Sequence, residues 1–291
     1  MKKKLLPLLG LLPILLWGCT GSTPAPQITA TTLPVYEFTK TLCDGTPLTV
    51  GRLITQSVSC LHDYSLNVDQ VKQAEGAETI VISGGGLEEF MEDILDSSKT
   101  IDASSGIALL EGEEHHHDEE EDHEGHEHDP HFWLDPQNAV IMAQNICEGL
   151  IRRYPQYRSQ FQENLSPLLQ RLNELDAYGT ETLKGLSCRK LITFHDGFAY
   201  FAQAFDLEIL AAVEEESGSE ASAKDLIQLI QLVRSNDLPA IFIEKNGSSA
   251  AATIICAETG ANAFTLDMAM AGDSYFEAMY NNLNAIKEAL Q

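Results

Sequence analysis

The sequence is short of basic side chains. It contains 18 Lys and Arg residues against 44 Asp and Glu residues in a chain of 291, which gives a formal net charge of −26. Because nucleic-acid phosphates are neutralised by basic surface, this balance argues against a nucleic-acid partner. The excess of acid is partly local, since eleven of the 44 acidic residues lie between Glu111 and Asp129. That segment needs an explanation beyond the usual one, which is a well-hydrated surface.

Long apolar runs are scarce as well. The run Leu5–Trp17 has about thirteen residues, fewer than the roughly 20 that a helix needs to cross a bilayer, and no second stretch is long enough. Lys2, Lys3 and Lys4 precede this run and small residues follow it. A basic start, a short apolar segment and small residues together predict that residues 1–18 are a secretory signal.

The end of the predicted signal carries a more specific pattern. Leu16-Trp17-Gly18-Cys19 resembles the lipobox of bacterial lipoproteins, which implies cleavage before Cys19 and attachment of lipid to it. Residues 19–27 are then expected to be a polar, Pro-containing tether between the membrane and the fold. The alternatives are an ordinary signal peptide and a buried N-terminal helix.

The six cysteines include no CxxC pair, which argues against a structural zinc cluster. Five remain once Cys19 is lipidated, and an exported protein can form disulfides. The pairings to test are Cys43–Cys60 and Cys188–Cys256, which leave one thiol unpaired.

Two catalytic or nucleotide-binding motifs are also missing. His123-Glu124-Gly125-His126 places its second histidine one residue too early for the HExxH motif of zinc proteases, which needs both histidines on one helical face. Gly84-Gly85-Gly86 lacks the spacing of a dinucleotide-binding loop and any following Lys-Ser/Thr pair. A tight turn is therefore the expected role of the three glycines.

The remaining sequence alternates between strand and helix patterns. The first part predicts strands at Ile28–Thr32 and Thr79–Ser83 and helices at Leu87–Leu95, Gln137–Arg153 and Ser159–Leu186. The second part predicts strands at Arg189–Thr193, Leu207–Val213, Ala240–Glu244 and Asn262–Leu266, with a helix at Ser222–Arg234. Such alternation favours a parallel α/β sheet. We expect two α/β lobes with parallel sheets, 28–157 and 187–291, joined by a long rigid helix over 158–186.

The nine histidines carry most of the functional information. Six lie in the acidic segment 111–129: His115, His116, His117, His123, His126 and His128. This segment is either a solvated, disordered loop and nothing more, or a loop that collects metal through many weak imidazole and carboxylate sites. The other three are His62, His131 and His195; prolines flank the stretch around His131, and His195 follows a predicted strand. Such contexts fix where a side chain points, as a metal site requires.

Four motifs now support a family resemblance. His-Asp-Tyr at His62, DPHFWLDP around His131, TFHDGFAYF around His195 and GDSY at Asp273 resemble the zinc and manganese substrate-binding lipoproteins of bacterial ABC importers. The similarity extends from about Ala30 to the C-terminus. It implies a metal held in the cleft between the lobes by His62 and His131 from the first and His195 from the second. It also implies a lipid-anchored, extracytoplasmic monomer that delivers metal, without catalysis, to a membrane permease driven by a separate ATPase.

The fourth ligand and the metal are less strongly determined. The resemblance favours Asp273, with water, Asp267 or Glu244 as alternatives, while Asp63, Asp135 and Asp196 are candidates for orienting the imidazoles. Three imidazoles and one carboxylate suit Zn²⁺ better than Mn²⁺. Manganese-type relatives tend to carry a glutamate at the position of His195. Zinc is therefore the expected cargo; the alternatives are a manganese importer subunit, a zinc hydrolase, and a surface metal buffer or adhesin.

Overall fold

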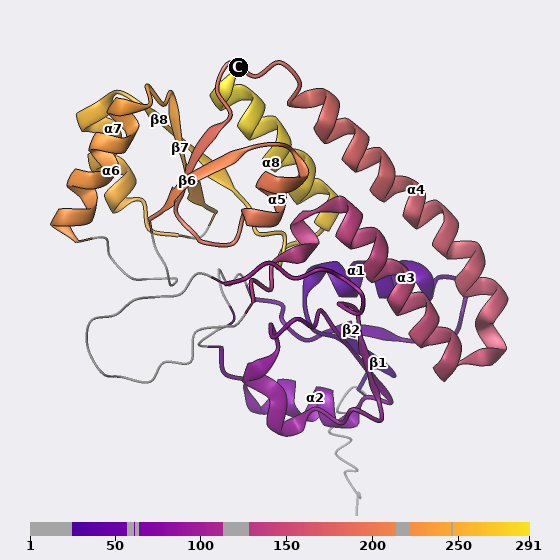
Figure 1. Cartoon of the computed structure of the whole chain (residues 1–291). Helices are drawn as coiled ribbons and strands as arrows, with labels where there is room; N and C mark the ends of the chain where they lie inside the picture. Colours follow the sequence, from indigo (N-terminus) through magenta and orange to yellow (C-terminus); the bar gives the residue numbers. More distant parts are fainter. Residues whose placement is uncertain (1–24, 57–60, 62–63, 113–127, 214–221, 246) are drawn as a thin grey trace, which may run out of the picture.

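The computed structural model describes residues 25–56, 61, 64–112, 128–213, 222–245 and 247–291. These residues form two α/β lobes beside one long helix, α4 (Figure 1). The predicted signal and lipid-attachment site lie outside the described residues, as do His62, Asp63, Cys60 and most of the acidic segment. Among the residues described, no helix is long and apolar enough to cross a membrane.

The first lobe and the connecting helix take up residues 28–182. Their elements are β1 (Ile28–Ala30), α1 (Leu33–Leu42), β2 (Val50–Arg52), α2 (Val68–Gly76), β3 (Thr79–Ile82), η1 (Glu89–Ile94), β4 (Thr100–Asp102), η2 (Phe132–Leu134), α3 (Pro136–Arg153), η3 (Pro155–Tyr157) and α4 (Arg158–Thr182). The sheet is parallel throughout, with strand order β2-β1-β3-β4.

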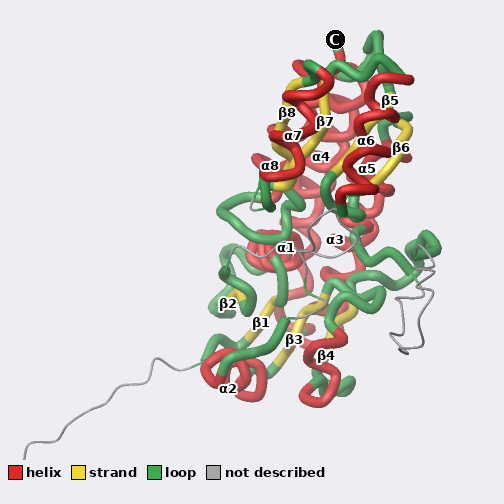
Figure 2. The backbone as a smooth tube through the Cα atoms, turned by 90° about the vertical axis from the view of Figure 1, so that its left-hand side faces the viewer, coloured by secondary structure: helices red, strands yellow, loops and turns green. Residues whose placement is uncertain are grey.

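The second lobe repeats this strand arrangement. Its elements are β5 (Lys190–Thr193), α5 (Ala199–Ala204), β6 (Glu208–Ala212), α6 (Ala223–Ser235), β7 (Ala240–Glu244), α7 (Ala250–Thr259), β8 (Asn262–Leu266) and α8 (Tyr275–Leu290). The parallel order is β6-β5-β7-β8, which corresponds strand for strand to the first sheet. Figure 2 shows the two sheets one above the other, each with helices on its sides. The prediction of two parallel-sheet lobes is confirmed.

Helix α4 packs on both lobes. It contacts α1 and α3 of the first lobe and α8 of the second. Its 25 residues span about 37 Å at 1.5 Å per residue. The side chains that it buries form one stripe: Phe161, Leu168, Leu172 and Leu175, with Gly179 at the end. The long connecting helix is thus confirmed, although it ends at Thr182 and not at Leu186.

The lobes also contact each other directly. One hydrophobic cluster includes Phe38 of α1, Trp133 of η2 and Tyr275 of α8. The Trp133 indole N–H donates to the Met268 carbonyl at 2.8 Å, and the Tyr275 hydroxyl donates to the Trp133 carbonyl at 2.8 Å. The Tyr275 backbone N–H donates to the Glu37 carboxylate at 2.6 Å. These contacts fix the two lobes against each other near their facing ends.

Two expectations from sequence need correction. The segment Leu87–Leu95 forms a short 3₁₀ helix at Glu89–Ile94 in place of an α-helix. Its start is held by the buried Glu88, whose carboxylate accepts hydrogen bonds from the backbone N–H groups of Ser83 and Gly84 at 2.8 and 2.9 Å. These bonds use the Glu88 side chain to close the turn between β3 and the 3₁₀ helix.

The Cys188–Cys256 pairing was also wrong. Cys188 and Cys256 are both half-buried free thiols, so the expected disulfide between them is absent. Cys43 is a buried free thiol, and Cys60 lies outside the described residues. Burial raises the pKa of Cys43 to about 12, which keeps this thiol protonated and unreactive.

Candidate metal centre

His131 lies at the face of the first lobe that meets the second. It immediately precedes the 3₁₀ turn Phe132–Leu134, and the residue is 2% exposed. The indole of Trp133 packs edge-on against its ring, with centroids 5.4 Å apart. Since Trp133 is itself anchored on the Met268 carbonyl of the second lobe, the position of His131 depends on the contact between the lobes.

His195 reaches the same place from the second lobe. It follows β5 by two residues, at the carboxyl end of that strand, where ligands of parallel sheets usually bind. Gly197 leaves space for its ring: a Cβ at Gly197 would lie 2.8 Å from the His195 Cδ2 atom and 2.6 Å from the Met268 methyl group. A side chain at this position would displace the imidazole.

The two imidazoles are adjacent and nearly perpendicular. The ring centroids of His131 and His195 lie 5.2 Å apart at an interplanar angle of 88°. With zinc–nitrogen bonds of about 2.0–2.1 Å and tetrahedral angles, two rings on one ion would have centroids about 5 Å apart. The observed spacing therefore suits two nitrogen ligands of one ion.

Asp129 orients His131. Its Oδ1 atom lies 2.8 Å from the His131 Nδ1 atom and accepts a hydrogen bond from the His131 backbone N–H at 2.8 Å. Burial alone would raise the pKa of Asp129, but the hydrogen bonds and nearby charge of His131, with a smaller contribution from His195, lower this pKa overall. The carboxylate is thus ionised at neutral pH, holds Nδ1 in its donor form and leaves Nε2 of His131 for a ligand.

Asp129 was not predicted from sequence as the residue that orients His131; the candidates for that role were Asp63, Asp135 and Asp196. Asp135 instead caps α3, accepting from the Gln137 N–H at 2.7 Å, and Asp196 is half-buried directly after His195. The signal for Asp129 was the Asp-Pro-His order itself, because an Asp side chain readily accepts from the backbone N–H two residues on.

The three candidate carboxylate ligands differ in their surroundings. Asp273 is exposed in the turn before α8, and Asp267 accepts a hydrogen bond from the Lys245 ammonium at 2.9 Å. Glu244 is buried at the end of β7. Within the described ranges, no three His, Cys, Asp or Glu side chains are placed to hold one ion together. The structure brings together His131 and His195, and His62 lies outside the described residues.

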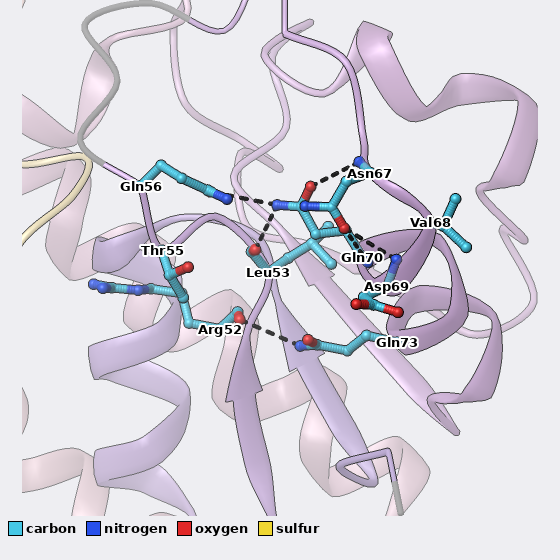
Figure 3. A pocket seen from close by; sticks show the side chains of 9 residues that line it. All are labelled: Arg52, Leu53, Thr55, Gln56, Asn67, Val68, Asp69, Gln70 and Gln73. Atoms are coloured by element: carbon cyan, nitrogen blue, oxygen red, sulfur yellow. Dashed lines mark hydrogen bonds between the residues drawn. The ribbon is translucent and has the colours of Figure 1, made fainter. Parts of the chain in front are cut away.

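A pocket of ≈ 490 Å³ lies elsewhere in the first lobe, between β2 and the start of α2 (Figure 3). Polar side chains dominate its lining, among them Gln56, Gln70 and Gln73. Gln70 and Gln73 donate to the carbonyl groups of Leu53 and Arg52, at 2.9 and 3.3 Å. These amides hold α2 against β2, and neither His131 nor His195 lines the pocket.

Comparison with known families agrees with this geometry. A family model described as "Zinc-uptake complex component A periplasmic", the ZnuA family, matches residues 28–289. The chain belongs to this family. The match begins at the first residue of β1 and ends one residue before the end of α8, so it covers both lobes and the connecting helix of the ZnuA fold.

Individual ZnuA relatives are moderately similar. The zinc-binding lipoprotein AdcA of Streptococcus pneumoniae is 31% identical over 99% of this chain. This chain spans only 61% of the length of that relative. A crystal structure of ZnuA matches 91% of this chain and all of that chain with a TM-score of 0.78 and 29% identity. Zn(II)-bound AdcA from Streptococcus pneumoniae matches 91% of this chain and 57% of that chain, with a TM-score of 0.77 and 29% identity.

Proposed function

We propose that this protein is an extracytoplasmic zinc-binding protein that delivers Zn²⁺ to an ABC import permease. The observation that carries the proposal is the pair of buried imidazoles, one from each lobe, at the spacing of two ligands on one ion. Membership of a zinc-uptake family supports the same function. The Zn(II)-bound form of the similar AdcA structure supports zinc as the cargo.

In this proposal the ion is bound by His62 and His131 from the first lobe, His195 from the second, and Asp273 as the fourth ligand. Neutral imidazoles and one carboxylate replace the water shell of Zn²⁺ and match its preference for four N and O ligands. The Asp129 carboxylate supports this role by fixing the ring nitrogen of His131 that does not bind metal. Binding and release, without a chemical step, make up the whole cycle.

The remaining assignments follow from the sequence. Cys19 carries the lipid that anchors the protein to the outer side of the bacterial cell membrane, and the lipoprotein name of the similar AdcA supports this. The loaded monomer docks on a permease whose transport is driven by a separate ATPase. The histidines of the acidic segment collect metal; they are His115, His116, His117, His123, His126 and His128.

The decisive experiment is a competitive titration of the purified soluble part with Zn²⁺ and Mn²⁺. We compare wild type, His131→Ala and a deletion of Glu113–His128. One tight zinc site that manganese does not displace should persist in the deletion and disappear in His131→Ala. Only weak sites that vanish with the deletion would instead identify a metal buffer and contradict the cleft. Tighter binding of manganese would identify a manganese importer subunit.

A further inference from the structure

Tyr200 is a second-lobe residue whose polar group bonds entirely within the first lobe. It lies in α5, five residues after His195, and its side chain is 2% exposed. Its hydroxyl accepts a hydrogen bond from the Leu110 backbone N–H at 2.7 Å and donates one to the Asp129 carbonyl at 2.9 Å. Leu110 directly precedes the acidic segment 111–129, and Asp129 is its last residue.

These two partners are opposite members of a short strand pair. The Asp129 N–H donates to the Leu110 carbonyl at 3.0 Å. Glu111, which follows Leu110, and His128, which precedes Asp129, form an antiparallel bridge. Residues opposite each other in a hydrogen-bonded antiparallel pair normally exchange two direct N–H···O bonds. Here the second bond is replaced by the Tyr200 hydroxyl, which is inserted between the Leu110 N–H and the Asp129 carbonyl.

The insertion acts on the metal centre through Asp129. The backbone of Asp129 is held by Tyr200, and its carboxylate holds the His131 ring and backbone N–H. The Tyr200 ring also packs edge-on against Phe132, the residue after His131, with centroids 6.3 Å apart. The chain of contacts from the second lobe to His131 is therefore continuous.

We propose that Tyr200 is a positioning residue of the metal site, which completes the Leu110–Asp129 pair and thereby fixes the Asp129 carboxylate against His131. This inference rests on the proposed zinc-binding function. It makes the orientation of a first-lobe ligand depend on a side chain of the second lobe. The contact between the lobes then helps to hold His131 in the orientation in which it binds metal.

The hydroxyl suits this task. Burial raises the pKa of Tyr200 to about 12, so it keeps its proton and can always donate to the Asp129 carbonyl. A phenylalanine would fill the same space and keep the ring contact with Phe132. It would leave the Leu110 N–H and the Asp129 carbonyl without this partner, and buried backbone groups are seldom left unpaired.

The test compares Tyr200→Phe with Tyr154→Phe. Tyr154 is also buried, and its hydroxyl shares a hydrogen bond of 2.9 Å with the Thr79 hydroxyl, away from the histidines. Both variants lose one buried hydroxyl, so they control for a general loss of stability. We expect Tyr200→Phe to weaken zinc binding about tenfold, as removal of an outer-shell partner does. We also expect an altered visible absorption spectrum of the Co²⁺ form, with Tyr154→Phe like wild type in both.

A metal-free measurement separates this inference from the proposed function. In the metal-free protein, Tyr200→Phe should accelerate amide hydrogen exchange at Leu110 and Asp129, and Tyr154→Phe should not. If Tyr200→Phe has the same zinc affinity, Co²⁺ spectrum and amide exchange rates as wild type, the positioning role is overturned and the proposed function stays intact. Absence of tight zinc binding in wild type would overturn both, although faster exchange in the variant would still identify the contact.

Discussion

Gly179 provides a sharp test of how α4 packs on the second lobe. Gly179 lies near the C-terminal end of α4 and is buried. Replacement by alanine should stabilise an isolated helix by about 1 kcal/mol, because glycine is a poor helix former. An alanine Cβ here would, however, lie 2.2 Å from the Phe205 Cε1 atom and 3.0 Å from the Leu283 Cδ2 atom. The two effects have opposite signs.

Packing should decide the outcome. Ordinary carbon contacts begin near 3.5 Å, so the Phe205 ring and α4 would have to separate by about 1.3 Å. The ring has little freedom, since Phe205 is 4% exposed and packs on Phe201 with centroids 4.8 Å apart. Overpacking of this kind costs about 1–3 kcal/mol. After subtraction of the gain in helix propensity, we expect Gly179→Ala to lower the free energy of unfolding by up to about 2 kcal/mol.

Urea unfolding monitored by circular dichroism measures this change. The midpoint should fall with an unchanged denaturant slope. The matched control is Thr180→Ala, the next and exposed residue of α4, which should be stabilising by a few tenths of a kcal/mol. In a Phe205→Leu background the cost of Gly179→Ala should shrink, giving a measurable coupling energy. A Gly179→Ala variant stabilised by about 1 kcal/mol would refute the close packing of α4 on the second lobe.

Three further predictions concern single groups. Burial, the largest influence, raises the pKa of Glu88 from 4.5 to about 7, so the folded state keeps a proton that the unfolded state releases. This contribution to the free energy of unfolding is complete below pH 4.5 and is lost as the pH rises through 7. In urea unfolding, Glu88→Gln should lack this part of the pH dependence. Identical pH profiles for Glu88→Gln and wild type would contradict the raised pKa of Glu88. Asp129→Asn keeps the shape of the side chain but removes its charge, and should weaken zinc binding about 10–100-fold in the competitive titration; unchanged affinity would exclude Asp129 as a partner of His131. Alkylation of the native protein followed by mass spectrometry should label Cys188 and Cys256 but not Cys43, whereas a Cys188–Cys256 disulfide would protect both.

The long, regular elements could be predicted from sequence. The strands β5, β7 and β8 and the helices α3 and α6 lie within one or two residues of their predicted bounds. At the start of helix α6, Ser222 and Asp225 form a reciprocal capping box, a pattern of residues that is visible in the sequence. The strands β2 and β4 were missed, because three residues are too few to establish an alternating pattern and the sheet supplies their stability. Tertiary contacts, not local preference, select such short strands.

The site could be predicted only in part, because sequence patterns identify residues but not the contacts between lobes. His131 and His195 were predicted and are adjacent. Tyr200 gave no separate signal: it is one of several aromatic residues in TFHDGFAYF, and only the fold shows that its hydroxyl reaches Leu110. The Asp-Pro-His order indicated the role of Asp129, but Asp129 is one of eleven acidic residues in its segment and was therefore not singled out. The ligand roles of His62, His131, His195 and Asp273 all stay predictions.

The contacts between the lobes have a consequence for affinity. Two independent lobes would have to be ordered when an ion binds, and this ordering would reduce the net binding free energy. Here Trp133 bonds to Met268, and α4 packs on both lobes, so much of that order exists before the ion arrives. The distance between His131 and His195 is then set by close-packed side chains, which resist small displacements. A preorganised pair of imidazoles favours ions with short metal–nitrogen bonds, and this is the physical reason why zinc, and not a larger ion that prefers oxygen ligands, is the proposed cargo.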